Sequence, residues 1–271
     1  MAKASEPVDP DLPDAGRGDQ AAAGHWLLAR LGKRVLRPGG IELTRTLLGR
    51  AELPGADVVE LAPGLGRTAA EIVAARPRSY RGVDADPAAV RATGPVVAAY
   101  GEVRVADAAE TGLDDASADV VVGEAMLTMQ GDKTKDAIIT EAVRLLRPGG
   151  RYAIHELGLA PDDLPDDVKT DVRRALARSI KVNARPLTVA EWSDLLTGHG
   201  LVVDHVDTAP MALLQPRRLV SDEGIVGALR FARNLLTHPD ARRRVLAMRK
   251  TFRTHRKHLL AVAVTAHKPT G

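Results

Sequence analysis

Short apolar runs that alternate with helical patterns constrain the fold of this chain more than any other feature of its sequence. Five such runs lie between residues 57 and 156, and two more follow near the C-terminus. We predict strands at Asp57–Leu61, Ser79–Val83, Glu102–Ala106, Asp119–Gly123, Tyr152–Glu156, Leu201–Val206 and Leu259–Ala266. Nearly continuous apolar strands separated by helices are typical of a parallel sheet covered by helices on both faces. The sequence therefore predicts a doubly wound α/β fold.

Helices are predicted between these strands, and several carry recognisable end signals. Asp86 is a natural N-cap with Pro87 at the first helical position, and the sequence from Thr188 to Glu191 forms a capping box. Proline and glycine in the sequence 147–150 end a preceding helix and turn the chain back. The three helices expected between the first five strands are Arg67–Ala75, Pro87–Ala98 and Lys133–Leu146.

Composition excludes several classes of protein. The chain of 271 residues is 45% apolar and can bury a substantial core, and it has no cysteine, which excludes disulfides, thiolate zinc sites and a cysteine nucleophile. No uncharged apolar run approaches the roughly 18 residues that a membrane span requires. Residues 1–20 are acidic and contain proline, so we expect a disordered acidic tail rather than a signal peptide. The sequence thus predicts a cytoplasmic protein.

Three segments do not fit the alternation of strands and helices. We interpret residues 21–52 as an N-terminal helical cap, and residues 161–185 and 208–258 as helical insertions into a domain that spans 53–268. The longer insertion is a candidate lid or dimerisation arm, so a homodimer is compatible with the sequence. It contains two apolar stripes at helical spacing, which we interpret as packing faces: Ile225, Leu229, Ala232 and Leu236, then Val245, Met248 and Phe252.

The sequence from Val58 to Ala69, VVELAPGLGRTA, is a strand that runs into a glycine turn and a helix. Gly64, Gly66 and Ala69 formally match the dinucleotide pattern G-x-G-x-x-G/A. Ligands of such sheets bind beyond the carboxyl ends of the strands. Acidic residues stand at these ends one after another: Glu60, Asp84, Asp107, Glu124 and Glu156.

Glu60 distinguishes between the ligands that a glycine turn can hold. A pyrophosphate is anionic and binds to bare amide groups at a helix N-terminus, so a carboxylate four residues before Gly64 would repel it. A ligand with a cationic head and no phosphate is favoured by the same carboxylate. S-adenosylmethionine has a sulfonium, an ammonium and a ribose diol, and it satisfies this condition.

From Val58 to Glu156 the chain resembles the class I S-adenosylmethionine-dependent methyltransferases, in the small-molecule group that includes the ubiquinone and menaquinone methylases. The segments that carry the resemblance are VVELAPGLGRTA, YRGVDADPAAV, VRVADAAE, ADVVVGEAML and EAVRLLRPGGRYAIHE, in family order. The resemblance implies a Rossmann-like sheet of seven strands, mostly parallel with an antiparallel last strand, and S-adenosylhomocysteine as the product.

The resemblance also assigns residues to the cofactor. Asp84 corresponds to the acid that holds the ribose hydroxyls, and Asp107 with the Ala108 amide to the adenine site. Ala62 stands where the family has its first glycine, and Pro63 stiffens the turn. The implied cofactor residues are Glu60, Ala62, Pro63, Gly64, Gly66, Asp84, Ala85, Asp107, Ala108, Glu124 and, from the turn before the sheet, Arg37; Arg67 is an equal candidate for the cofactor's carboxylate.

Methyl transfer to an oxygen requires a base more often than transfer to an uncharged amine. His155, Glu156 and Glu124 are the candidates for this catalytic role, although His155 can instead point into a helix layer because strand side chains alternate. Met126 and Met129 can line a substrate pocket or belong to the core. No cluster of metal ligands is evident, so we expect no metal.

We therefore predict methyl transfer from S-adenosylmethionine to an oxygen, nitrogen or carbon atom of a small organic molecule. Three alternatives remain. A NAD(P)-dependent oxidoreductase conflicts with Glu60, and a non-catalytic cofactor-binding protein would use the basic insertion for its main contact. An RNA methyltransferase is favoured by twelve Lys or Arg against three acids between Arg217 and Lys257. Nucleic acid nevertheless remains the less favoured partner, because no aromatic residues alternate with these charges.

Overall fold

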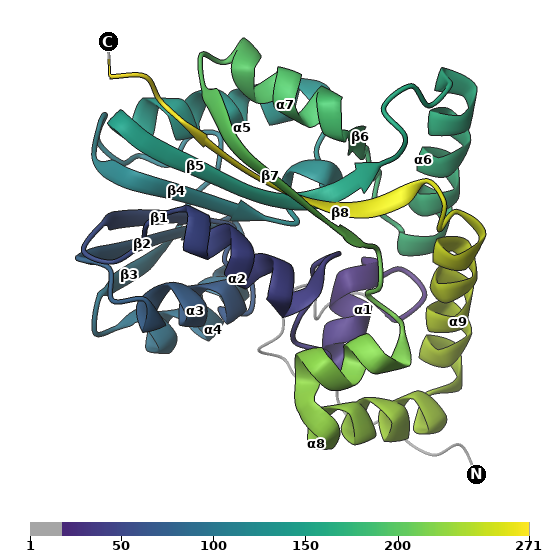
Figure 1. The fold of residues 1–271 in the computed structure, drawn as a ribbon. Coiled ribbons are helices and arrows are strands. Elements are labelled where there is room, and N and C mark those ends of the chain that lie inside the picture. Colours follow the sequence, from purple (N-terminus) through teal and green to yellow (C-terminus); the bar gives the residue numbers. More distant parts are fainter. Residues whose placement is uncertain (1–17, 271) are drawn as a thin grey trace.

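The computed structural model describes residues 18–270, so the expected acidic tail over residues 1–20 lies almost entirely outside it. One sheet runs through the molecule, with its strands in the order β3-β2-β1-β4-β5-β8-β7 (Figure 1). The strands are β1 Asp57–Leu61, β2 Ser79–Asp84, β3 Gly101–Val105, β4 Ala118–Glu124, β5 Leu146–Leu159, β7 Val202–Pro210 and β8 Leu259–His267. A further strand of two residues, β6 (Leu187–Thr188), pairs with β5.

Strand β8 is antiparallel to both β5 and β7, while the other pairs are parallel. The predicted doubly wound, mostly parallel sheet with an antiparallel last strand is confirmed. The strand order reverses between β1 and β4, which are neighbours in the sheet although β2 and β3 lie between them in the chain. A crevice at such a reversal is where open parallel sheets bind their ligands.

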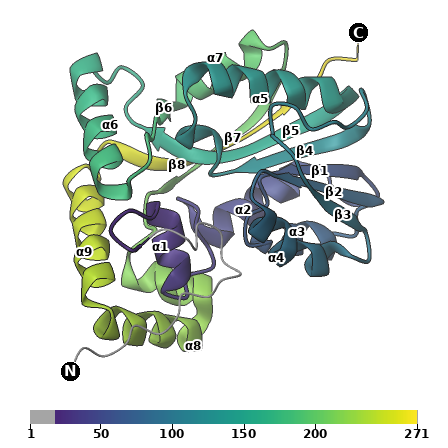
Figure 2. The ribbon, with the colours of Figure 1, turned by 180° about the vertical axis from the view of Figure 1, so that it is seen from behind.

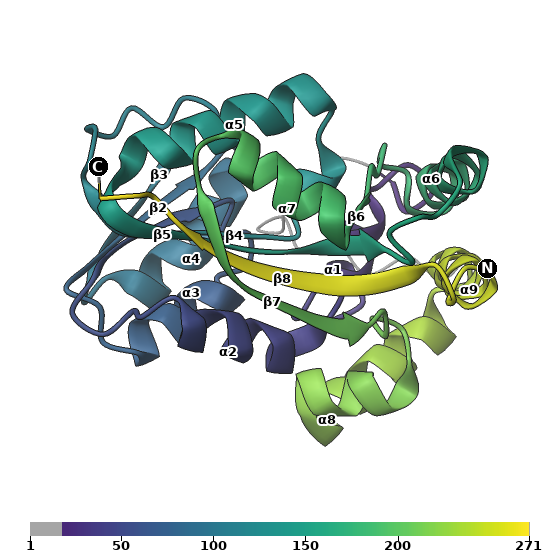
Figure 3. The same ribbon diagram turned by 45° about the horizontal axis from the view of Figure 1, so that its top comes forward.

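Helices cover both faces of the sheet, as Figure 3 shows. Helices α2 (Gly40–Arg50), α3 (Arg67–Ala74) and α4 (Pro87–Val97) lie on one face, and α5 (Asp132–Leu145) and α7 (Val189–Gly198) on the other. Their apolar stripes meet buried strand residues in two core clusters. The expected end signals are present: Asp86 caps α4 by accepting from the Ala88 amide, and the capping box from Thr188 to Glu191 starts α7.

Four helices gather beyond the carboxyl ends of the parallel strands (Figures 1 and 2). They are α1 (Gly24–Arg30), α6 (Asp166–Ile180), α8 (Pro216–Thr237) and α9 (Pro239–Thr254). Leu28, Phe231, Val245 and Met248 belong to a common core that joins α1, α8 and α9. The division into a cap, a domain and two insertions stays a prediction, and these helices fall within its expected limits.

One predicted packing face is wrong. Ile225, Leu229 and Leu236 of α8 are 71%, 66% and 71% exposed, whereas Phe231 on the opposite side of the helix is 5% exposed and joins the core. The period correctly predicts a helix, but the chain buries its other face. The second stripe packs as expected, since Val245 and Met248 are 4% and 1% exposed.

Several element boundaries differ from the prediction, most of all in β5 and at the end of β7, which continues to Pro210. Strand β5 begins at Leu146 rather than Tyr152 and includes the proline–glycine sequence, with an irregular register against β4 between Ala118 and Val120. Within the expected cap over residues 21–52, helix α1 ends at Arg30, before Gly32, which has a φ of 96°. None of the helices in the described part of the chain has the length and apolar character that a membrane span requires.

Candidate active site

The chain leaves β1 through a turn with left-handed backbone at three positions: Ala62, Gly64 and Gly66 have φ values of 56°, 58° and 71°. At Gly66 an added Cβ would lie 3.1 Å from the hydroxyl of Thr93, so glycine is required there for space as well as for conformation. Ala62 keeps the left-handed conformation despite its methyl group. Such strain at a strand end is typical of functional turns.

A cavity of about 240 Å³ opens at the carboxyl ends of β1, β2 and β4. Nine of the residues that the sequence assigned to the site line it: Arg37, Glu60, Ala62, Pro63, Gly64, Asp84, Glu124, Met126 and Met129. Ala85, Gly66, Asp107 and Ala108 are not among its lining residues, and their contact with a cofactor stays a prediction. Asp107 is exposed beyond β3, where its carboxylate accepts from the Ala109 amide at 2.8 Å.

Glu60 is buried, with an exposed fraction of 2%, and its carboxylate accepts a hydrogen bond of 2.6 Å from the Tyr80 hydroxyl. Burial raises the pKa of Glu60 to about 8, and the nearby negative charges of Glu124 and Asp84 act in the same direction. At neutral pH and without a ligand the carboxyl group is therefore mainly protonated.

Asp84 closes β2 and braces the glycine turn. Its two carboxylate oxygens accept from the backbone amides of Gly64 at 3.0 Å and Asp86 at 2.9 Å. Burial raises the pKa of Asp84, while the two amides oppose the shift. Each carboxylate oxygen retains a second lone pair, so hydroxyl donors can still bind there.

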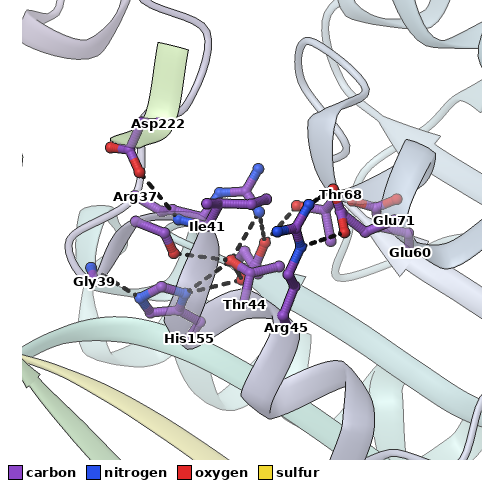
Figure 4. Close-up of polar contacts among 12 residues, drawn as sticks. Arg37, Gly39, Ile41, Thr44, Arg45, Glu60, Thr68, Glu71, His155 and Asp222 are labelled. Atoms are coloured by element: carbon purple, nitrogen blue, oxygen red, sulfur yellow. Dashed lines mark hydrogen bonds and ion pairs between the residues drawn. The ribbon is translucent and has the colours of Figure 1, made fainter. Parts of the chain in front are cut away.

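Glu124, at the end of β4, forms the centre of a polar cluster that Figure 4 shows in part. Its carboxylate binds the Arg37 guanidinium at 2.5 Å and the Thr44 hydroxyl at 2.7 Å, and it also accepts from the hydroxyl of Thr68. Burial acts to raise the pKa of Glu124, but the charge of Arg37 and the hydrogen bonds from His155 and Thr68 outweigh it and lower the pKa to about 2. Glu124 is therefore a poor proton acceptor near neutrality.

His155 lies beneath this cluster and is fully buried. Its Nε2 accepts from the Gly39 amide at 3.1 Å, which can only donate, so the ring proton is on Nδ1 and faces Glu124 Oε1 at 2.9 Å. His155 lines neither this cavity nor the apolar cavity described below. A catalytic role for His155 stays a prediction, and the geometry favours a positioning role instead.

The sequence Arg37-Pro38-Gly39-Gly40 connects the cap to this cluster (Figure 4). Arg37 reaches Glu124, and the Gly39 amide reaches His155. A Cβ at Gly39 would lie 2.5 Å from Cδ2 of Leu43 and 2.9 Å from Nε2 of His155. Only glycine allows the backbone to approach the imidazole this closely.

Glu156 is fully buried one residue further along β5. It accepts from the amides of Met126, Leu127 and Thr128 and from the Thr128 hydroxyl, at distances between 2.6 and 3.0 Å. Burial raises the pKa of Glu156, and these hydrogen bonds oppose the shift. Four donors hold the carboxylate in place, so the geometry favours a role in fixing the segment after β4 over the predicted role as a base.

The residues present fit S-adenosylmethionine. Glu60 and Asp84 offer carboxylates for an ammonium and a diol, and the left-handed turn at Gly64 lets a ligand approach the backbone closely. Arg67 lines the same cavity, and its buried Nε has no hydrogen-bond partner among the described residues. An unsatisfied guanidinium donor is suited to a carboxylate.

A second cavity, of about 80 Å³, adjoins the first. The two share His25, Leu36, Ala125 and Met129 in their walls. The remaining wall of the second cavity is mostly apolar and comes mainly from the helices beyond the sheet: Leu28, Leu176, Ile180, Ala184, Met248 and Phe252. Glu156 and Thr128, which are hydrogen-bonded to each other, also line it.

Sequence reasoning missed several residues that the structure brings to the site. Thr44 and Thr68 complete the hydrogen bonds of Glu124, and the Trp26 ring lies 3.8 Å from the position of a Cβ at Gly64. Thr68 follows the glycine turn directly, which could have indicated its role. Nothing local in the sequence indicates Thr44, which lies 80 residues from Glu124.

Comparison with known proteins agrees with this arrangement. Residues 59–154 match the family model described as a methyltransferase domain. An uncharacterised protein of Haemophilus influenzae is 33% identical over 249 residues, which cover 88% of this chain and 96% of that protein.

Solved structures share the fold at low sequence identity. The [4+2]-cyclase SpnF has a TM-score of 0.70 at 15% identity, with 90% of this chain and 93% of that chain covered. Phosphoethanolamine N-methyltransferase 2 of Haemonchus contortus, in complex with S-adenosyl-L-methionine, has a TM-score of 0.66 at 15% identity over 93% of this chain and 57% of its own.

A doubly wound sheet with an acidic, glycine-turned crevice at its strand reversal defines an enzyme of the methyltransferase type. Residues 59–154, which run from β1 into β5, form a methyltransferase domain, and the enzyme is of the class I S-adenosylmethionine-dependent type. Its cofactor is S-adenosylmethionine.

Proposed function

We propose that the protein transfers a methyl group from S-adenosylmethionine to a small, mainly apolar molecule. The observation that supports this acceptor class is the apolar cavity that shares His25, Leu36, Ala125 and Met129 with the cofactor cavity. An acceptor in this cavity would lie against the end of β4, beside the expected position of the methyl group. When bound, the cofactor supplies a methyl group activated by the positive charge on its sulfur.

The contribution of this chain to the reaction would be orientation and exclusion of water. Holding two reactants in line can supply about 7–11 kcal/mol of the barrier. Arg37, Glu124 and Glu156 fix the segment after β4 through buried contacts, and they would hold Ala125 and Met126 in place between the two cavities. If the acceptor atom must lose a proton, His25 is the imidazole that lines both cavities.

The proposal can be tested by filling the apolar cavity. Ala184 is 1% exposed and lines this cavity but not the cofactor cavity. We expect Ala184→Leu to lower kcat/KM for an acceptor, found by screening metabolites with labelled cofactor, by about tenfold or more, because side chains that overfill a site exclude its ligand. The affinity for S-adenosylhomocysteine, measured by calorimetry, should stay within twofold.

Ala232→Leu is the matched control, because Ala232 lies on the exposed face of α8 and should leave both values unchanged. An Ala184→Leu variant that methylates the acceptor normally would contradict the location of the acceptor. The cyclase neighbour shows that this fold also occurs in a protein named for another reaction. S-adenosylhomocysteine production is therefore the required readout, and a protein that binds the cofactor without transfer to any acceptor would contradict the proposed reaction.

A further inference from the structure

A groove lined by four arginines adjoins the apolar cavity on its outer side. Arg217 comes from the start of α8, and Arg249, Arg253 and Arg256 come from the end of α9 and the turn after it. The groove has a volume of about 590 Å³, and no acidic residue lines it. The elements that form it belong to the insertion between β7 and β8.

These four guanidinium groups are unpaired. Among the residues that the structure describes, none of the four side chains forms an ion pair or a side-chain hydrogen bond. Other arginines of the same two helices do find partners, since Arg218 binds Glu42 and Arg243 binds Asp240. Four like charges around one groove repel one another unless an anion lies between them. Their arrangement is therefore suited to a multiply charged anion.

The start of α8 strengthens this preference. The helix begins at Pro216 with Gln215 as its N-cap, and both residues line the groove. No side chain caps this end, and since Pro216 has no N–H, the uncapped amides of the first turn are those of Arg217 and Arg218. Amides at a helix N-terminus favour anions, phosphate in particular.

The groove adjoins the apolar cavity that is proposed for the acceptor. Met211, Leu213 and Phe252 line both the groove and the apolar cavity. The apolar cavity, at about 80 Å³, has room for only a small part of a metabolite. A molecule with its reactive end in the apolar cavity would extend past these three side chains toward the arginines.

We propose that the arginine groove binds a phosphate group of the methyl acceptor. The acceptor is then an apolar molecule with a phosphate or diphosphate at the end remote from the methylated atom. Guanidinium groups bind phosphate oxygens in a bidentate manner and keep their charge at all relevant pH values. This substrate class rests on the proposed function, whereas phosphate binding by the groove can be tested without it.

The first test measures binding with octyl phosphate as the probe and octanol as its uncharged counterpart. Calorimetry is carried out with S-adenosylhomocysteine present, on the native protein and on the double variant Arg217→Glu/Arg253→Glu. We expect octyl phosphate to bind the native protein at least tenfold more tightly than octanol does. The double variant should lose at least tenfold in affinity for octyl phosphate and retain its affinity for octanol.

The matched control is Arg233→Glu/Arg242→Glu, which makes the same change in net charge at exposed positions of the same two helices outside the groove. It should bind octyl phosphate within twofold of the native protein. Equal losses in the two double variants would overturn the proposal, because the effect would then be one of overall charge. Equal binding of octyl phosphate and octanol to the native protein would also overturn it. Melting temperature and affinity for S-adenosylhomocysteine show whether each variant is folded.

A second arm distinguishes a soluble phosphate ester from a lipid headgroup. Vesicles of phosphatidic acid in phosphatidylcholine are sedimented with the native protein and with both double variants. We expect no groove-dependent sedimentation and strong binding of monomeric octyl phosphate, because the groove adjoins an internal cavity. Sedimentation that only the groove variant loses would identify the phosphate as that of a membrane lipid and overturn the assignment to a soluble acceptor.

The last arm concerns the acceptor itself. Removal of the phosphate from the acceptor identified by screening, or the Arg217→Glu/Arg253→Glu change, should lower kcat/KM at least tenfold. A neutral acceptor methylated equally by the native protein and the variant would overturn the substrate class and leave methyl transfer intact. Failure of methyl transfer to every acceptor would instead contradict the proposed function. The octyl phosphate experiment would still show whether the groove binds phosphate.

Discussion

Two glutamates at neighbouring strand ends show how strongly their partners determine their charge. Glu60 and Glu124 are both buried, yet the pKa of Glu60 is raised to about 8 and that of Glu124 is lowered to about 2. Burial acts on both in the same direction. Arg37, His155 and Thr68 reverse its effect at Glu124, whereas among the described residues Glu60 has the Tyr80 hydroxyl as its only direct hydrogen-bond partner. Glu60 is thus the carboxylate whose charge a cationic ligand can change.

Ligand binding should therefore release a proton from Glu60. Without a ligand its pKa is about 8, and a nearby ammonium group favours the charged form and lowers this pKa. Below about pH 8 the free carboxyl is mainly protonated, and the ligand's ammonium group shifts the bound carboxyl toward its ionised form. We expect S-adenosylhomocysteine binding at pH 7 to release most of one proton, measured by calorimetry in buffers of different ionisation enthalpy.

Glu60→Gln is the control for this measurement, because it keeps the shape of the side chain and cannot ionise. Its binding should release no proton, and its affinity should be lower than that of the native protein. Proton release of the same size in both proteins would contradict the assignment to Glu60.

At the residue scale, the sequence predicted the acidic residues that line the cavity, but it did not predict which residues form hydrogen bonds and ion pairs with them. Glu60, Asp84 and Glu124 could be found because carboxyl ends of parallel strands meet in space. The role of His155 depends on the Gly39 amide, 116 residues away, and that of Arg37 on Glu124, 87 residues away. Contacts of this length are set by packing of whole elements, and no local pattern encodes them.

At the element scale, the spacing of apolar residues predicted where helices lie in the sequence better than it predicted which face of a helix is buried. The stripe at Ile225, Leu229 and Leu236 has the spacing of a helix, and a helix is present. Which face it buries depends on the path of the chain before it, and here non-helical backbone at Gly224 interrupts α8. Helix α5 of the sheet buries Ile138, Ile139 and Ala142 in the core.

Gly39, just before α2, is the site of a testable substitution, and Gly49, near the end of the same helix, provides its control. A Cβ at Gly39 meets Leu43 and His155, whereas one at Gly49 meets nothing within 4 Å. We expect Gly39→Ala to lower the free energy of unfolding by about 1–3 kcal/mol through overpacking. Gly49→Ala should raise it by about 0.5–1 kcal/mol, because alanine favours the helix. Urea denaturation measures both.

If Gly39→Ala proved as stable as the native protein, the tight approach of this turn to the imidazole would be refuted. A loss of stability in Gly49→Ala would show that its exposed position has an unrecognised contact.

At the scale of the whole molecule, a buried ion cluster joins the first helices to the long insertion. Lys33 is fully buried, and its ammonium lies 3.2 Å from Asp222 and 3.4 Å from Glu223. Asp222 also accepts a hydrogen bond from the Ile41 amide at the start of α2 (Figure 4). Thr44 of the same helix binds Glu124, so α2 links the ion cluster to the polar cluster around Glu124. The two segments that flank the apolar cavity are thereby held in one arrangement.

Removal of this cation should be costly. Lys33→Met leaves two carboxylates near the interior without their partner, which typically costs about 3–5 kcal/mol. We expect a loss of this size in the free energy of unfolding at pH 7. Lys257→Met, at an exposed position, is the control and should change stability little.

A loss in Lys33→Met no larger than that in Lys257→Met would contradict the role of the buried Lys33 ion pairs.

The Lys33 cluster also limits how this enzyme could be re-engineered. A chimera that receives residues 208–258 from another methyltransferase, but keeps its own first fifty residues, would carry a buried ammonium with no counter-ion. The reverse chimera, with this insertion and the first fifty residues of another methyltransferase, would leave Asp222 and Glu223 without their cationic partner. Acceptor preference in this scaffold should therefore be exchangeable only when both pieces are transplanted together.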